Sequence, residues 1–261
     1  MWALYVVPRV FRFNSRQRVG FGALLIAFCV LVVAKLTAVT GPSKIRVLLL
    51  TGGHAYERKP FLEIFQSNPE IVVTHLEHTA KAADAWDRAD VTAHDVVVLY
   101  DMARELTDSQ RARFMSLFAR GTGLVVLHHA LVSFQRWPEY ERLIGGRYFD
   151  VPEKGGDPRE TPSGYQHDVD QQIRVVPGHP VTAGIPDFEI HDEIYWGFRV
   201  GKDVEPLLTT AHPRSGNPIG WTRDENKSRV VYLQLGHGPS AYSHPSYRRL
   251  VGNAIRYGAR R

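Results

Sequence analysis

The chain has 261 residues, and its hydrophobic fraction of 44% is sufficient for a substantial core. Its formal net charge is +5, and five cations with no acidic neighbour lie in the first 43 residues: Arg9, Arg12, Arg16, Arg18 and Lys35. The rest of the chain is therefore formally neutral. Nucleic-acid binding needs basic side chains spread over a folded surface, so we expect no nucleic-acid partner.

Residues 19–39 form an almost wholly apolar segment that is interrupted by Lys35. A helix that rises about 1.5 Å per residue over this length reaches about 30 Å, which is one hydrocarbon thickness. Because four arginines precede the segment, the positive-inside rule assigns residues 1–18 to the cytoplasm as a basic leader. The sequence thus predicts one N-terminal transmembrane helix, a single-pass membrane protein, and an extracytoplasmic domain, periplasmic or extracellular, from residue 44.

A cleaved signal peptide is the alternative interpretation of the same segment. Ala38-Val39-Thr40 offers the small residues that a signal peptidase accepts. Cleavage there would release a secreted domain, whereas an uncleaved segment 19–39 would anchor it to the membrane.

The domain from residue 44 alternates apolar runs with amphipathic stretches. Strands are predicted at 44–50, 71–76, 95–100 and 124–129, and the first, which is apolar in character, fits a parallel sheet covered on both faces. A helix is predicted over 107–119, with Thr107 as its cap. Shorter strands are predicted at 172–176, 219–222 and 229–233, and a closing helix at 245–257. This alternation predicts an α/β fold with an open, mainly parallel sheet.

Histidine and carboxylate groups occur where these strands end or in expected turns. The segments are Gly52-Gly53-His54, His128-His129, His167-Asp168, His191-Asp192-Glu193 and Gly236-His237-Gly238. Ligands of such sheets bind at the carboxyl ends of the strands, so we expect these groups to converge there. Successive side chains of a regular strand point to opposite faces, so only one of His128 and His129 should face the site.

Two kinds of chemistry remain open for this cluster. Some of its imidazoles, from His54, His128, His191 and His237, can bind a divalent metal such as zinc together with Asp192 or Glu193. The same groups can instead form a metal-free acid–base site. Cys29, the only cysteine, lies in the apolar segment, so the domain has neither a disulfide nor a thiol nucleophile.

Several motifs, taken in order, resemble the ThuA-like (trehalose utilisation) family over nearly all of residues 44–261. They are Thr51-Gly-Gly-His54, residues 123–128, Trp137 followed by residues 144–149, residues 179–186, residues 192–195 and residues 229–237. The family is similar to class I glutamine amidotransferases in fold, which implies a flavodoxin-like three-layer sandwich. In those enzymes a cysteine occupies the sharp turn that here holds His128, so glutamine hydrolysis is not expected.

The resemblance also implies a role with sugars or oxidised (keto) sugars. The prediction is therefore an extracytoplasmic enzyme with a small carbohydrate as its partner, and the alternative is a non-catalytic carbohydrate-binding or interaction domain. The expected catalytic residues are His128, His237, Asp192 and Glu193. The expected substrate-binding residues are His54, Gly53, His129, Tyr195 and Trp137, and the expected metal ligands are His54, His128 and His237.

Overall fold

The computed structural model describes residues 43–79, 83–150 and 162–261. The predicted leader, 1–18, and the predicted membrane segment, 19–39, lie outside the described residues. Within the described ranges, no helix combines the length and the apolar character that crossing a membrane requires.

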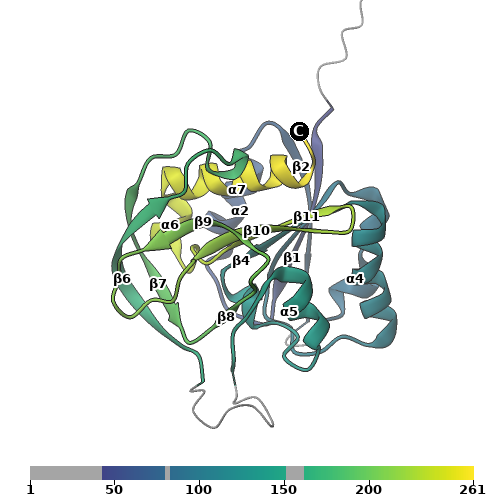
Figure 1. Cartoon of the computed structure of the whole chain (residues 1–261). Helices are drawn as coiled ribbons and strands as arrows, with labels where there is room; N and C mark the ends of the chain where they lie inside the picture. Colours follow the sequence, from purple (N-terminus) through teal and green to yellow (C-terminus); the bar gives the residue numbers. More distant parts are fainter. Residues whose placement is uncertain (1–42, 80–82, 151–161) are drawn as a thin grey trace, which may run out of the picture. The chain divides into compact units, whose positions relative to one another are not determined.

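A nine-stranded sheet passes through the described part of the chain, in the order β2-β1-β3-β4-β11-β10-β9-β6-β7 (Figure 1). The strands are β1 Ile45–Gly52, β2 Ile71–Glu77, β3 Val96–Asp101, β4 Gly123–Leu127, β6 Gly164–Val175, β7 Phe188–Trp196, β9 Glu205–Thr210, β10 Gly220–Glu225 and β11 Ser228–Leu233. The five strands from β2 to β11 are parallel, and each later neighbour pairs antiparallel. A separate ladder joins β5 (Gly146–Arg147) to β8 (Arg199–Val200).

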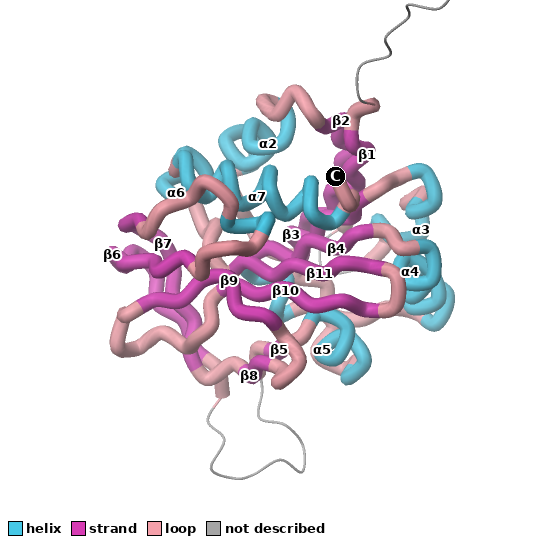
Figure 2. The backbone as a smooth tube through the Cα atoms, turned by 45° about the horizontal axis from the view of Figure 1, so that its top comes forward, coloured by secondary structure: helices cyan, strands magenta, loops and turns pink. Residues whose placement is uncertain are grey.

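Helices cover both faces of this sheet (Figure 2). On one face lie α2 (Arg58–Gln66), α6 (Pro239–Ser243) and α7 (Pro245–Gly258), and on the other lie α3 (Ala85–Arg88), α4 (Asp108–Arg120) and α5 (Pro138–Ile144). Alternate residues of β1 show the division, because Val47 and Leu49 belong to the first core and Leu48 and Leu50 to the second. The fold is mixed α/β with a large sheet whose inner parallel strands are buried on both faces, whereas the edge strand β2 is partly exposed.

The predicted capping of the helix after residue 107 is confirmed. The Thr107 hydroxyl accepts the Gln110 backbone N–H at 3.3 Å, and the Gln110 side chain accepts the Thr107 backbone N–H at 2.9 Å. This reciprocal arrangement satisfies two donors that a helix start otherwise leaves unpaired. Gly121, in the left-handed region with φ of 81°, ends the helix.

The fourth predicted strand is too long. Strand β4 ends at Leu127, and residues His128–Val132 form a short 3₁₀ turn. His128 itself has a φ of 51°, which breaks the extended backbone. The strict alternation expected for His128 and His129 is therefore wrong, since neither residue lies on a strand.

The antiparallel half of the sheet curls back over the carboxyl ends of the parallel strands. Strand β7 is five positions away from β4 in the sheet, which in a flat sheet would be about 24 Å. Nevertheless, Glu193 of β7 lies 2.8 Å from His128, the residue that follows β4. This curvature encloses a space beside the ends of the parallel strands.

Candidate active site

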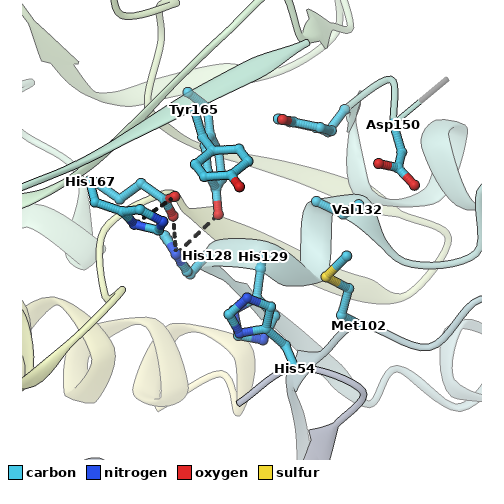
Figure 3. Close-up of a pocket in the computed structure, with 11 residues that line it drawn as sticks. His54, Met102, His128, His129, Val132, Asp150, Tyr165 and His167 are labelled. Atoms are coloured by element: carbon cyan, nitrogen blue, oxygen red, sulfur yellow. Dashed lines mark hydrogen bonds and ion pairs between the residues drawn. The ribbon is translucent and has the colours of Figure 1, made fainter. Parts of the chain in front are cut away.

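A cavity of about 230 Å³ lies where the parallel strands end (Figure 3). Its lining comes from both halves of the sheet: His54 follows β1, while Glu193 and Tyr195 belong to β7. Among the described residues, the lining is His54, Met102, His128, His129, Val132, Tyr148, Asp150, Tyr165, His167, Glu193 and Tyr195. Imidazole, carboxyl and phenol groups therefore face one small volume, as in a site for a small polar ligand.

His128 is held in a fixed orientation at the base of the cavity. Its Nδ1 lies 2.6 Å from the carbonyl oxygen of Gln234. Because a carbonyl only accepts, Nδ1 carries a proton and Nε2 points the other way. Nε2 lies 2.8 Å from Glu193 Oε2, 3.0 Å from the Tyr195 hydroxyl and 3.2 Å from His237 Nδ1.

Glu193 reaches this point from the outermost strand, β7, opposite a β-bulge in β6. In the pairing of β6 with β7, His167 and Asp168 together oppose Glu193 alone, and Asp168 has a φ of 55°. The bulge brings His167 Nδ1 to 3.2 Å from Glu193 Oε1. The two carboxylate oxygens of Glu193 thus have different partners, since Oε2 faces His128 and His237.

His237 is positioned through its backbone. The buried carboxylate of Asp192 accepts the N–H of Gly236 at 2.7 Å and the N–H of His237 at 2.9 Å. On the other side of this loop, the Tyr100 hydroxyl donates to the Gly236 carbonyl and the Tyr242 hydroxyl to the His237 carbonyl. Asp192 therefore positions His237 and does not line the cavity.

The charges of the site are set by burial and by these contacts. Burial by itself would raise the pKa of Glu193, but hydrogen bonds with His128 and His237 outweigh it and hold that pKa well below its usual value. The hydrogen bond with Glu193 raises the pKa of His237 against the effect of burial. Burial raises the pKa of Asp192, although its backbone hydrogen bonds act in the opposite direction.

A second pair of imidazoles forms another part of the wall. The ring centroids of His54 and His129 are 4.6 Å apart, and Figure 3 shows the two rings together. His54 Nδ1 lies 2.7 Å from the carbonyl of Ala55, which leaves Nε2 as an acceptor. Neither ring nitrogen of His129 makes a well-formed hydrogen bond. Burial, the main cause in both, lowers the pKa of His54 and lowers that of His129 strongly.

Within the described residues, one group of side chains is arranged so that it could hold a metal ion. It consists of His128, Glu193 and His237, whose ligand atoms all lie within 4.8 Å of one another. The predicted set consisted of His54, His128 and His237, with Asp192 or Glu193 as a possible carboxylate ligand. His54 is directed elsewhere because its Nδ1 bonds its own neighbour and its ring packs on His129.

Comparison with known proteins assigns the chain to a family. A family model described as trehalose utilisation, ThuA, matches residues 46–258. The chain belongs to the ThuA family. No curated protein matches the chain.

Solved structures agree with the ThuA fold. A ThuA-like protein from Parabacteroides merdae is 19% identical with a TM-score of 0.72, and the match covers 83% of this chain and 90% of that one. A ThuA-like protein from Bacteroides uniformis is 22% identical with a TM-score of 0.61, covering 85% and 94%. A β-galactosidase from Rahnella sp. R3 has a TM-score of 0.53 at 11% identity, with coverage of 90% of this chain and 35% of that chain. At these identities the likeness concerns the fold alone.

Four residues that the sequence assigned to the ThuA site are not part of the cavity lining: Asp192 and His237, described above, and Trp137 and Gly53. Trp137 precedes α5 and packs against Phe114 and Phe134. Gly53 has a φ of 79°, and a Cβ atom there would lie 2.6 Å from the carbonyl oxygen of Met102. Its role in the structure is thus a close backbone approach that only glycine permits.

The cavity of this ThuA domain also contains residues outside the expected catalytic, substrate-binding and metal-binding sets. Tyr148, Asp150 and Tyr165 line the cavity, and His167 contacts Glu193. The segment His167-Asp168 carried a weak signal, because it places an imidazole beside a carboxylate. His191, by contrast, is half-exposed and contacts Asp170 instead of the cavity.

Proposed function

We propose that the chain is an enzyme that acts on a sugar or an oxidised (keto) sugar derivative. Its chemistry would be acid–base transfer by His128, His237 and Glu193, with or without help from a divalent metal such as zinc. The observation that carries this proposal is the convergence of three side chains from distant segments: the turn after β4, strand β7 and the loop after β11. His128 and Glu193 are buried there, and His237 is partly buried. Burying ionisable groups costs free energy, and such clusters are concentrated at functional sites.

The lining of the cavity supports a carbohydrate as the ligand. A volume of about 230 Å³ suits a single sugar ring. Tyr148, Tyr165 and Tyr195 offer hydroxyls for hydrogen bonds and flat faces for packing, and Asp150 offers a carboxylate that can accept from sugar hydroxyls. The family description, trehalose utilisation, points to the same class of compound.

The residues would take distinct roles. His128 and His237 would exchange protons with the ligand, and Glu193 would stabilise their charged forms. The Tyr195 hydroxyl would donate to a ligand oxygen bound beside His128. His54 Nε2 and the ring of His129 would contact the ligand from another part of the wall. Glutamine hydrolysis is not part of the proposal because the domain has no thiol.

We also propose an extracytoplasmic location for the domain, with residues 19–39 as its membrane anchor. The support is the sequence pattern alone: an apolar segment preceded by four arginines. Signal cleavage would give the same location with a secreted product.

His128→Ala tests the enzymatic proposal. The full chain, kept in mild detergent because of its apolar segment, is incubated with a panel of mono- and disaccharides and their keto derivatives, and products are followed by NMR. We expect turnover by the wild type to fall at least about 100-fold in the variant, the range typical for loss of an acid–base group. The matched control is His191→Ala, which removes a half-exposed imidazole from the same strand as Glu193.

Circular dichroism of each variant establishes that it is folded. Turnover that persists in folded His128→Ala would refute the assigned role. Sugar binding that survives replacement of both His128 and His237, with no product from any compound, would instead indicate a non-catalytic binding domain.

A further inference from the structure

We propose that His128, Glu193 and His237 bind one divalent transition-metal ion in a six-coordinate, facial arrangement, and that the substrate chelates this ion through two adjacent oxygens. The ion itself follows from the geometry of the three side chains. The chelating substrate rests on the proposed function, and its class would be a sugar with a carbonyl next to a hydroxyl.

The spacing of the three ligand atoms fits six-coordination. Glu193 Oε2 lies 2.8 Å from His128 Nε2 and 3.2 Å from His237 Nδ1, and the two nitrogens are 3.2 Å apart. With metal–ligand bonds of about 2.1 Å, neighbouring ligands are about 3.0 Å apart in an octahedron and about 3.4 Å apart in a tetrahedron. The observed triangle is closer to one face of an octahedron.

The orientation of His128 calls for positive charge at the centre of this triangle. Since the Nδ1–H of His128 donates a hydrogen bond to the Gln234 carbonyl, a neutral ring presents the lone pair of Nε2 to a carboxylate oxygen 2.8 Å away. Two lone pairs at that separation repel unless a cation lies between them. A metal ion or a second proton on the ring meets this need, and the two can be distinguished by experiment.

The surroundings of the triangle are those of a metal site. Histidine ligands usually donate their other ring N–H to a carbonyl or carboxylate, which fixes the ring. His128 does so to Gln234, and His167 holds the second oxygen of Glu193 so that Oε2 alone faces the centre. Asp192 fixes the backbone that carries His237.

The free side of the ion would face the cavity. His128 and Glu193 both line the cavity, so an ion bound to them keeps coordination positions on that side. Two neighbouring positions suit the oxygens of an adjacent carbonyl and hydroxyl. The Tyr195 hydroxyl, 3.0 Å from His128 Nε2, lies beside those positions and can donate to a bound oxygen. Two histidines and one carboxylate with open positions are typical of sites for first-row divalent metals.

Metal binding without any sugar tests the site directly. The full chain, purified in mild detergent without a histidine tag, is stripped with a chelator and titrated by calorimetry with Mn²⁺, Co²⁺ or Zn²⁺. We expect one ion per chain. Glu193→Gln and His237→Ala should each weaken binding at least 100-fold, while His54→Ala and His191→Ala bind as the wild type does. The Co²⁺ complex should show the weak visible bands of a six-coordinate ion.

Thermal unfolding of each variant separates loss of ligand from loss of fold. Should Glu193→Gln unfold, His237→Ala still tests the site, because Asp192 holds the backbone and not the ring. Failure of the wild type to bind any of the three ions, or unaltered binding by folded Glu193→Gln, would overturn the metal site. A second proton on the His128 ring would then be the source of the positive charge between His128 and Glu193.

The substrate half has its own measurement. A hydroxy-ketone sugar should shift the Co²⁺ spectrum, whereas the corresponding sugar with no carbonyl should shift it less. An ion that binds as expected with no spectral response to any sugar would refute the chelating substrate and count against the proposed function, while leaving the metal site in place.

Discussion

Asp192→Asn tests how the loop that carries His237 is held. The carboxylate accepts two backbone N–H groups, from Gly236 and His237, in a fully buried setting. Asparagine keeps the shape, but its amide group turns a donor toward one of them. One hydrogen bond to a charged acceptor is lost, which costs about 1.5–3 kcal/mol. Burial already disfavours the carboxylate, and relief of that penalty offsets part of the loss. We expect the free energy of unfolding to fall by about 2 kcal/mol.

Urea unfolding followed by circular dichroism measures this change. For a domain of this size, about 2 kcal/mol corresponds to a decrease of about 4–8 °C in the melting temperature. Asp170→Asn is the matched control, since Asp170 lies on the neighbouring strand with its side chain 92% exposed. Its effect should stay within about 0.5 kcal/mol. Equal stability of Asp192→Asn and the wild type, or an equal loss in both variants, would refute the argument.

Two further predictions concern stability. Asp95 accepts hydrogen bonds from Arg46, mainly from its side chain, and these lower the pKa of Asp95 below the unfolded value. At pH values above the pKa of Asp95 in the unfolded chain, the partly exposed pair should stabilise the fold by about 1 kcal/mol. This stabilisation is lost as the pH falls through the lower pKa of Asp95 in the folded protein. Asp95→Asn should therefore lower the free energy of unfolding at pH 7, as measured by urea titration. The difference in this free energy between the variant and the wild type should be smaller at pH 3, and a difference that does not change with pH would contradict the argument. Gly236→Ala should cost at least about 2 kcal/mol, because φ is 113° and its Cβ would overlap the buried Tyr247 hydroxyl. Gly238→Ala, with open space around it, is the control, and equal melting temperatures for the two variants would contradict the reasoning.

The parallel half of the fold could be predicted from the sequence because its signals are local. Strands β1 and β3 are continuous apolar runs, as strands buried on both faces must be. Their carboxyl ends meet at one edge, so the expectation that His54, His128 and His237 would lie near one another followed from topology alone. In the structure, the ring centroids of His54 and His237 are 6.4 Å apart.

The antiparallel half could not be predicted in the same way. Strand β6 exposes most of its first five side chains and so lacks a clear apolar pattern. Glu193 contacts His128 because the whole sheet is curved, and the bulge of β6 lies opposite it. Neither the curvature nor the bulge can be predicted from the residues of a single short segment. This is why the predicted metal set named His54 with His128 and His237, and Glu193 only as one of two possible carboxylate partners.

Trp137 illustrates a different limit. Its position in a family motif led to its prediction as a substrate-binding residue. Its neighbours in the structure, however, include Phe114, which lies on another helix and is distant in sequence. Composition shows that a large aromatic side chain must be covered, but only the packing of α4 against α5 decides what covers it.

The curled sheet makes the site depend on residues that never touch a ligand. In the sheet, strand β7 is connected to the parallel half through β6, β9 and β10, and Asp192 also links β7 directly to the loop that carries His237. The distance between Glu193 and the two imidazoles therefore depends on the twist of these strands as well as on that direct contact. A substitution that flattens β9 or β10 by a small angle would be amplified at the outermost strand. Differences in activity among relatives can therefore arise from remote strands, even where every side chain of the cavity is the same.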